Sequence, residues 1–406
     1  MQYLNGSKLI MLNSNLFLRS MFSKFSIMGT IAIALNLMVV APGRSELARS
    51  ARVQAIEGKG QVRVQRDNPT RRLFAREDME LDQGDLVIPD RGMSVEIVCP
   101  NGLTRSVTQV SGLGSVCPKW RTDMARGSQA SVTVGGIDVA VPYLISPRHT
   151  LLLDGKPTLR WNQVAGAKIY TVTVMGPKGT VWETRTQAAQ VVYGGPELQP
   201  GVAYSWVVKV EGGRSSEEDQ GTDGTVAKAL DFRVLQPAEV KAVRASVAQL
   251  TVGKPTASVR ALMVASLYGD YAVPTGTIGQ YGLEQGTVET YSLSGEAIAV
   301  LEQQIKAGKG SPILYRSLGD LYWQTGLIRL AGETYGKAIA EVMAPQDLEE
   351  WTTAQYGLAK VMAVMGDRGR MQQSLAQARM GFVFLGNAGK AAELQRRIEQ
   401  LEKGKS

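Results

Sequence analysis

One stretch in the C-terminal half has the spacing of a two-helix repeat, a unit that cannot fold alone. Residues 311–345 read SPILYRSLGDLYWQTGLIRLAGETYGKAIAEVMAP. Aromatic, aliphatic and small residues recur there at fixed offsets, at Tyr315, Leu318, Gly319, Tyr322, Gly326, Ala331, Tyr335 and Ala338. A single pair of helices leaves one apolar face uncovered, so such units stack on their neighbours. The stretch therefore predicts a helical array.

The small residues of this stretch have separate expected roles. Gly319 and Ala331 let two helices approach closely where they cross. Gly326 falls between the helices, where a left-handed backbone conformation favours glycine. The side chains expected to fill the space between helices are Leu318, Tyr322 and Tyr335.

Weaker copies of the pattern flank this stretch. One copy follows at Leu358, Ala359, Met362, Gly366, Met371, Leu375 and Ala378. Another would pair helices over 261–271 and 295–306, with a flexible insertion over 273–294 between them. A closing helix is expected around the apolar stripe Leu394, Ile398 and Leu401. The region 257–402 resembles a tetratricopeptide array; a plain helical bundle with coincidental spacing is the alternative.

The N-terminus carries an export signal. Residues 1–43 contain Lys8, Arg19 and Lys24 and no acidic residue, and an apolar run follows from Ile27 to Ala41. A basic flank before a short apolar core is typical of a signal peptide. The run is shorter than the roughly 20 residues of a comfortable membrane span. We expect a signal peptide or an N-terminal inner-membrane anchor, and a periplasmic or otherwise extracytoplasmic chain.

The cysteine content agrees with export. Cys99 and Cys117 are the two cysteines of the chain. A small, even number of cysteines in an exported protein predicts a disulfide. Closing a loop of this size would stabilise the fold by about 3 kcal/mol. Two buried thiols are the alternative.

Residues 44–130 are expected to be β-rich. The order of signals is Gly60–Val62, Leu81–Val87, Val95–Val98 and the turn Asn101-Gly102. Alternating apolar residues between such turns predict hairpins. The order resembles the FecR-like domain, with Cys-Pro pairs like those of cyanobacterial exported proteins. That resemblance implies a signal-relay module; only a short segment precedes the apolar run, so a sigma-factor partner is not carried over.

Residues 140–237 are expected to form a small β-sandwich. Short strands around Trp161, Trp182 and Trp206 alternate with turn residues, which is typical of a sandwich. The region resembles a fibronectin type III or Ig-like domain. The resemblance implies that Trp161 is the buried core tryptophan and that Tyr204 is the corner tyrosine, bonded to the backbone. A carbohydrate-stacking face made of the three tryptophans is the alternative.

Two further segments complete the predicted organisation. Residues 238–256 are expected to link the β-rich half to the helical half. The loop 211–225 holds Glu217, Glu218, Asp219 and Asp223, which could bind calcium, but their spacing is not that of an EF-hand. A solvated loop is the simpler expectation, so we predict no metal site.

No catalytic constellation is evident. His149 is the one histidine and is expected on a surface strand, so catalytic zinc bound by two or three histidines is excluded. A Ser-His-Asp or Cys-His site has no signature here, and no P-loop occurs. Paired carboxylates of a glycoside hydrolase remain open from sequence alone. We expect neither an enzyme nor a cofactor.

The net charge of +8 constrains the partner weakly. Nucleic-acid binding needs clustered basic residues with interleaved aromatics. Arg71-Arg72 is the only basic doublet of the first folded region, and acidic residues follow it closely. We exclude nucleic acid and keep an anionic envelope polymer as an alternative partner.

The sequence thus predicts an exported interaction or scaffold protein that binds a protein segment in the cell envelope. In a tetratricopeptide array the first helix of each unit lines the groove. The expected groove residues are Arg316, Asp320, Trp323, Gln324, Tyr356 and Lys360. The alternatives are an envelope signal relay through the FecR-like region, a cell-wall carbohydrate binder, and a groove closed by the chain's own β modules.

Overall fold

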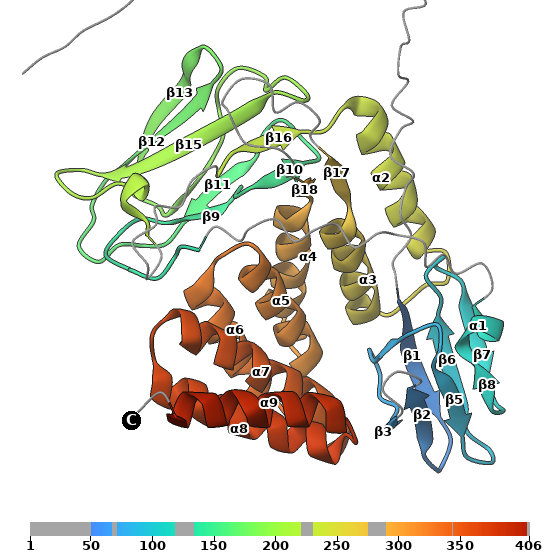
Figure 1. Cartoon of the computed structure of the whole chain (residues 1–406). Coiled ribbons are helices and arrows are strands. Elements are labelled where there is room, and N and C mark those ends of the chain that lie inside the picture. Colours follow the sequence, from blue (N-terminus) through green and yellow to red (C-terminus); the bar gives the residue numbers. More distant parts are fainter. Residues whose placement is uncertain are drawn as a thin grey trace, which may run out of the picture. The chain divides into compact units, whose positions relative to one another are not determined.

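The computed structural model confirms the expected fold class, a β-rich half followed by an all-helical array (Figure 1). It describes residues 50–66, 71–117, 134–220, 230–274, 290–342 and 344–403. In this part of the chain no helix is long and apolar enough to cross a membrane. The expected signal peptide or anchor, residues 1–43, lies outside the described residues.

The first β region, residues 50–117, contains two 4-stranded sheets, in the orders β4-β1-β6-β7 and β3-β2-β5-β8. Its elements are β1 (Ala51–Glu57), β2 (Val62–Arg66), β3 (Arg71–Phe74), β4 (Glu80–Leu81), β5 (Leu86–Pro89), β6 (Ser94–Val98), β7 (Thr104–Val107), β8 (Ser111–Gly112) and α1 (Leu113–Val116). Burial alternates along β2, as a strand with one covered face requires.

The predicted disulfide is present. Cys99 follows β6 and Cys117 follows α1, and a disulfide joins them with the Cα atoms 5.5 Å apart. Both residues are buried, and the bond holds the α1 end of the region against its central strand. Disulfides persist in oxidising, extracytoplasmic compartments, so this bond indicates such a location.

The second β region is a sandwich of a 3-stranded sheet, β14-β11-β9, and a 7-stranded sheet, β13-β12-β15-β16-β10-β18-β17. Its strands before the helices are β9 (Leu144–Ser146), β10 (Thr150–Leu152), β11 (Thr158–Trp161), β12 (Tyr170–Gly176), β13 (Gly179–Thr186), β14 (Gln190–Val192), β15 (Ala203–Val210) and β16 (Phe232–Val234). A 3-10 helix, η1 (Ser216–Glu218), follows β15.

The core of the sandwich uses the predicted aromatic residues. Trp161 and Trp206 are 3% and 2% exposed and lie edge to face, with centroids 6.2 Å apart. The Tyr204 hydroxyl accepts a hydrogen bond from the Gln199 backbone N–H at 2.9 Å, as expected of a corner tyrosine. Because two of the three tryptophans are buried, a stacking face made of all three is ruled out. Trp182 is half-buried.

The two described ends of the insertion that was expected to be flexible add strands to the sandwich. β17 (Ala272–Pro274) and β18 (Thr290–Ser292) pair with each other, and β18 runs parallel to β10. The Thr150 hydroxyl donates to the Ser292 carbonyl at 3.0 Å. Without β18, the edge of β10 would leave backbone N–H and C=O groups unpaired. This explains why the ends of the insertion form strands. Residues 275–289 lie outside the described part.

The expected linker, 238–256, also has defined contacts. It contains most of α2 (Pro237–Leu250), which begins with a capping box between Gln236 and Glu239. After this helix the Gly253 N–H donates to the Gly102 carbonyl at 2.8 Å. The segment is therefore docked on the β6–β7 turn of the first β region.

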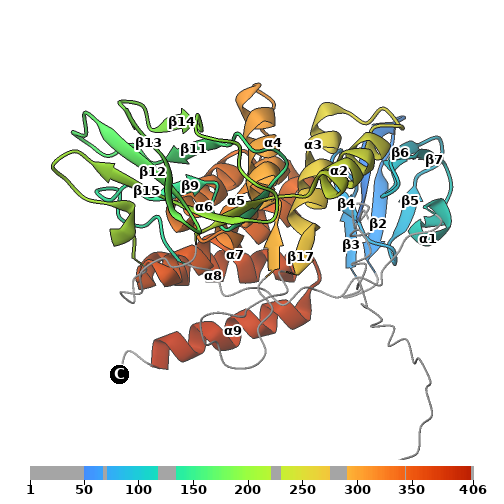
Figure 2. The same cartoon turned by 90° about the horizontal axis from the view of Figure 1, so that it is seen from above.

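The helical array consists of antiparallel helices, which are joined by short connections from α4 onward (Figures 1 and 2). Its helices are α3 (Ala257–Asp270), α4 (Ser294–Lys306), α5 (Pro312–Gln324), α6 (Ile328–Ala340), α7 (Leu348–Val364), α8 (Arg368–Phe384) and α9 (Ala388–Lys403); η2 (Pro345–Asp347) precedes α7. Packing joins α5 to α6, α6 to α7, α7 to α8 and α8 to α9, and α5 also contacts α7. This order fits the expected repeats.

Small residues form the helix crossings as predicted. Tyr335 is fully buried between two glycines of neighbouring helices. A Cβ at Gly319 or Gly357 would lie 2.8 or 2.4 Å from its ring. Ala331 is fully buried as well. Larger side chains at either glycine would push the helices apart.

One turn geometry occurs three times in the array. Gly326, Gly366 and Gly386 have φ values of 73°, 74° and 73°. At each turn the glycine N–H bonds to the carbonyl three residues earlier, and the next N–H bonds to the carbonyl five residues earlier. This is the pattern of a glycine helix C-cap.

The hydrophobic core is shared between regions. Buried apolar residues of the first β region and of the helical array form one continuous cluster, which includes Val53, Ile97, Leu250 and Met263. The sandwich has a cluster of its own. The first β region and the array are therefore one packing unit although the sequence separates them.

Candidate protein-binding surface on the helical array

The six predicted groove residues lie on α5 and α7. They form two groups with different surroundings. Arg316 and Asp320, in the first half and middle of α5, belong to ion pairs that reach the first β region. Trp323, Tyr356 and Lys360 form a separate aromatic and cationic group. Gln324, the last residue of α5, is exposed.

Arg316 is held by two carboxylates. Its Nε donates to Glu350 at 2.6 Å, and its Nη1 donates to Asp320 at 2.7 Å. The other oxygen of Asp320 accepts from the Tyr335 hydroxyl at 2.7 Å. Glu350 also accepts from Arg76, at the end of β3 in the first β region. A chain of charge-assisted bonds thus runs from the first β region into α5 and α6.

A further arginine, Arg66, also connects the first β region to α7. Arg66 donates to Asp85 at 2.6 Å within the first β region and to Glu349 of α7 at 3.3 Å. We call Arg66, Arg76, Arg316, Asp85, Glu349 and Glu350 the interface ion-pair cluster. Burial by itself would raise the pKa of Glu350, but Arg316 and Arg76 outweigh that effect, so its pKa is lowered. Glu350 is therefore charged at neutral pH.

These contacts change what Arg316 can be expected to do. Its side chain is 16% exposed and its partner Glu350 is 6% exposed. Removing one member of a buried ion pair strands the other charge and destabilises the protein. Replacing Arg316 therefore tests folding together with binding.

The second group forms a cation–π ladder made of Trp323, Lys360, Tyr356 and Lys390. The Lys360 ammonium lies 4.9 Å from the Trp323 ring centroid and 5.6 Å from that of Tyr356. The Lys390 ammonium lies 4.6 Å from the Tyr356 ring centroid. Cation–π contacts at these distances contribute about 0.5–1 kcal/mol each at accessible sites. The ladder crosses α5, α7 and α9, which are alternate helices of the array.

Lys390 was not among the predicted residues. The sequence pattern of α9 predicts a closing helix with an apolar stripe, and Lys390 lies outside that stripe. Lys390 donates to both oxygens of Glu393 at 2.8 and 2.9 Å, and its side chain is 27% exposed. Burial opposes its charge, but the bond to Glu393 prevails and raises the pKa of Lys390. No local signal distinguishes Lys390 from the other basic residues of α9.

The acidic residues of the loop that the structure describes have hydrogen-bond partners within the protein. Glu218 accepts from Arg214 at 2.8 Å, and Asp219 accepts from the Gly136 N–H at 2.8 Å beside Arg148. Asp223 lies outside the described residues. Among the residues that the structure describes, no group of three or more His, Cys, Asp or Glu side chains could hold a metal ion.

His149 is not a surface strand residue. It directly precedes β10 with φ 42°, and its half-buried ring stacks on Tyr291 at a centroid distance of 4.4 Å. Its contacts therefore belong to the junction of β10 and β18.

Comparison with protein-family models and with curated proteins finds no match for this chain.

Proposed function

We propose that the chain is a non-enzymatic, exported interaction protein whose helical array binds a segment of a partner protein in the cell envelope. The tetratricopeptide-like spacing and the alternating helices support this architecture. The disulfide supports an oxidising compartment, for which we propose the periplasm, with the basic and apolar N-terminus acting as signal peptide or inner-membrane tether. The FecR-like and fibronectin-like resemblances of the β regions are part of the same proposal.

The observation that carries the proposal is the cation–π ladder. It presents two half-buried lysines and two aromatic rings along three helices of one surface. Aromatic side chains supply contact area at low entropic cost, and a cation aligned by them favours an anionic partner. We therefore propose a partner segment with acidic residues that face Lys360 and Lys390. An anionic envelope polymer is the competing ligand of the same charge.

A photo-crosslinking residue at Gln324, exposed at the end of α5 beside Trp323, tests this proposal. In envelope preparations it should form adducts with a protein, and Lys360→Met should abolish them because methionine keeps the stem but lacks the charge. Lys337→Met, at an exposed position of α6, is the matched control and should leave adducts unchanged. Adducts that survive Lys360→Met, or that contain polymer without protein, would contradict the proposal.

The interface ion-pair cluster supports a second candidate function, a signal relay. Arg76 bonds to Glu350, Glu350 to Arg316, and Arg316 to Asp320, one turn before Trp323. An event that moved the first β region would therefore act on α5 directly. If the chain is a relay, Arg76→Gln should change the adduct yield at Gln324, whereas a pure scaffold should show the wild-type yield in folded protein.

A further inference from the structure

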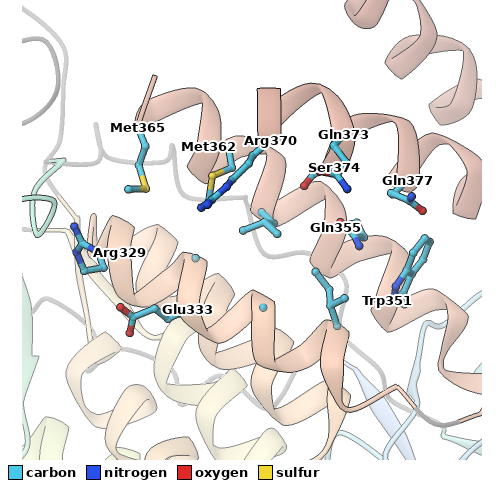
Figure 3. A pocket seen from close by; sticks show the side chains of 14 residues that line it. Arg329, Glu333, Trp351, Gln355, Met362, Met365, Arg370, Gln373, Ser374 and Gln377 are labelled. Carbon is cyan, nitrogen blue, oxygen red and sulfur yellow. The ribbon is translucent and has the colours of Figure 1, made fainter. Parts of the chain in front are cut away.

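A groove separate from the ladder runs between α6, α7 and α8. Its volume is about 640 Å³. Figure 3 shows Arg329 and Glu333 on the α6 wall, with Arg370, Gln373 and Gln377 on the α8 wall. The apolar lining consists of Ile339, Trp351, Leu358, Met362 and Met365.

Two glycines of α6 keep this groove open. Gly332 and Gly336 line it, one helical turn apart. A Cβ at Gly336 would meet no atom within 4 Å, so the space beside it is empty. A Cβ at Gly332 would lie 2.9 Å from Val361. Gly336 is thus a position where a large side chain would enter the groove instead of the core.

The floor of the groove is one face of α7. Its members lie at the offsets 0, 4, 7, 11 and 14, which place them on one stripe of a helix: Trp351, Gln355, Leu358, Met362 and Met365. Tyr356 and Lys360 lie on the opposite side of α7 by the same period. The groove and the ladder therefore use different surfaces of one helix.

The apolar surface continues along α8 beyond the groove. Gln373, Gln377, Met380 and Phe384 follow each other at offsets of 0, 4, 7 and 11 and share one face. Met380 is 42% exposed and Phe384 is 74% exposed, and neighbouring Val383 is 53% exposed. Exposed apolar side chains that adjoin a groove mark an interaction surface.

The charge of the walls limits what such a surface can bind. The charged residues of α8 are Arg368, Arg370 and Arg379, and its sequence contains no Asp or Glu. Arg370, which lines the groove, is 75% exposed and pairs at 3.4 Å with Asp367, which precedes α8. Arg329 adds a second positive charge, and Glu333 is the one acidic residue of the lining. The walls are thus complementary to an anionic partner.

We propose that this groove binds an amphipathic helix of a partner protein, with apolar residues at i, i+3, i+4 and i+7 and acidic residues beside them. Three helices face the groove with stripes of helical period, and a fourth helix packs into such stripes. Methionines adapt their shape to different apolar side chains, as grooves for helical ligands require. This inference is independent of the segment proposed to bind the ladder.

The test uses the full chain and a synthetic 18-residue helical peptide with a leucine stripe flanked by glutamates, read by fluorescence anisotropy. A twin peptide with lysine in place of glutamate should bind at least about tenfold more weakly. Gly336→Phe should weaken binding of the glutamate peptide by about tenfold or more, because the phenyl ring fills the groove. Gly336→Ala leaves the groove open and should bind as the wild type does. Lys360→Met should also bind normally, which separates this site from the ladder.

Phe384→Glu and Arg370→Glu provide an independent check because both side chains are exposed and leave the core untouched. Each variant should weaken binding of the glutamate peptide. This check holds even if circular dichroism shows that Gly336→Phe is misfolded. Equal binding of both peptides, no binding of either, or wild-type binding by these variants would overturn the proposal. Concentration-dependent self-association abolished by Phe384→Glu would assign the groove to a second copy of the chain and overturn it as well.

Discussion

Replacing Glu350 by glutamine should destabilise the chain by about 3 kcal/mol. The Glu350 side chain is 6% exposed and lies between Arg76 and Arg316, which are 9% and 16% exposed. Glutamine keeps the volume, but it removes the charge and turns an amide N–H₂ toward a guanidinium. Breaking a buried pair costs about 3–5 kcal/mol. We expect the lower end of this range because Asp347 and Asp320 remain beside the two arginines.

Urea unfolding of the full chain, followed by tryptophan fluorescence, measures this effect as a shift of the midpoint. Glu393→Gln is the control. Glu393 is 51% exposed in its pair with Lys390, so the control should change stability by less than about 1 kcal/mol. A double-mutant cycle with Arg76→Gln should show a coupling of about 1–3 kcal/mol across the interface. A loss below about 1 kcal/mol for Glu350→Gln would refute the reasoning, since it would mean that the first β region does not depend on this pair.

The pH dependence of the same variant has a defined sign. The pKa of Glu350 is lowered in the folded protein from its ordinary value of 4.5. The charged carboxylate therefore contributes its full stabilisation above pH 4.5, and this contribution is lost as pH falls through the folded pKa. The difference between wild type and Glu350→Gln should shrink below that pH. A difference that stays constant in acid would contradict the assignment.

Two further predictions concern the first β region. Gly102→Ala should destabilise by more than about 2 kcal/mol, because φ is +78° and a Cβ would lie 2.0 Å from the Gln249 carbonyl oxygen in the last turn of α2. Gly92→Ala, with φ +86° and open space, should cost only the backbone strain of about 1 kcal/mol. Thermal melts of both variants should separate the two effects, and equal losses would show that the α2 contact is dispensable. Burial raises the pKa of Asp78 to about 6, although Arg52 and Arg76 oppose the shift. Its ionisation therefore costs stability as pH rises from about 4 to 6, and Asp78→Asn should gain melting temperature over the wild type across that window; a gap independent of pH would exclude the group.

The local features of the array were predictable because they depend on short stretches of chain. Gly326 and Gly366 could be assigned to turns because left-handed backbone favours glycine, and Gly386 repeats the signal. Gly319 was expected at a crossing from its place in the repeat pattern, and Tyr335 packs against it. The bond between the Tyr204 hydroxyl and the Gln199 N–H was expected from the resemblance to a fibronectin type III or Ig-like domain, and it spans only a few residues.

Features that join distant segments were not predictable in the same way. The end of the insertion that precedes α4 forms a strand because β10, far away in the sequence, offers it a parallel edge. The linker likewise became ordered through the β6–β7 turn at Gly102. Each segment lacks a strong pattern of its own, and its order comes from hydrogen bonds that another region supplies.

By itself the sequence determined the β-rich half, the helical array and the disulfide, and it indicated the residue types of the candidate binding surface, since period, turn chemistry and cysteine content are properties of the local chain. Only the tertiary structure decided how that surface is divided. Arg316, which also bonds to Asp320, belongs to the interface ion-pair cluster because Arg76, separated by 274 residues from Glu350, brings a buried charge to it. Trp323, Tyr356 and Lys360 became a ladder because α9 adds Lys390. The energy of an ion pair depends on the distance between its charges in space. Periodicity in the sequence does not show which residues from distant segments will lie close together.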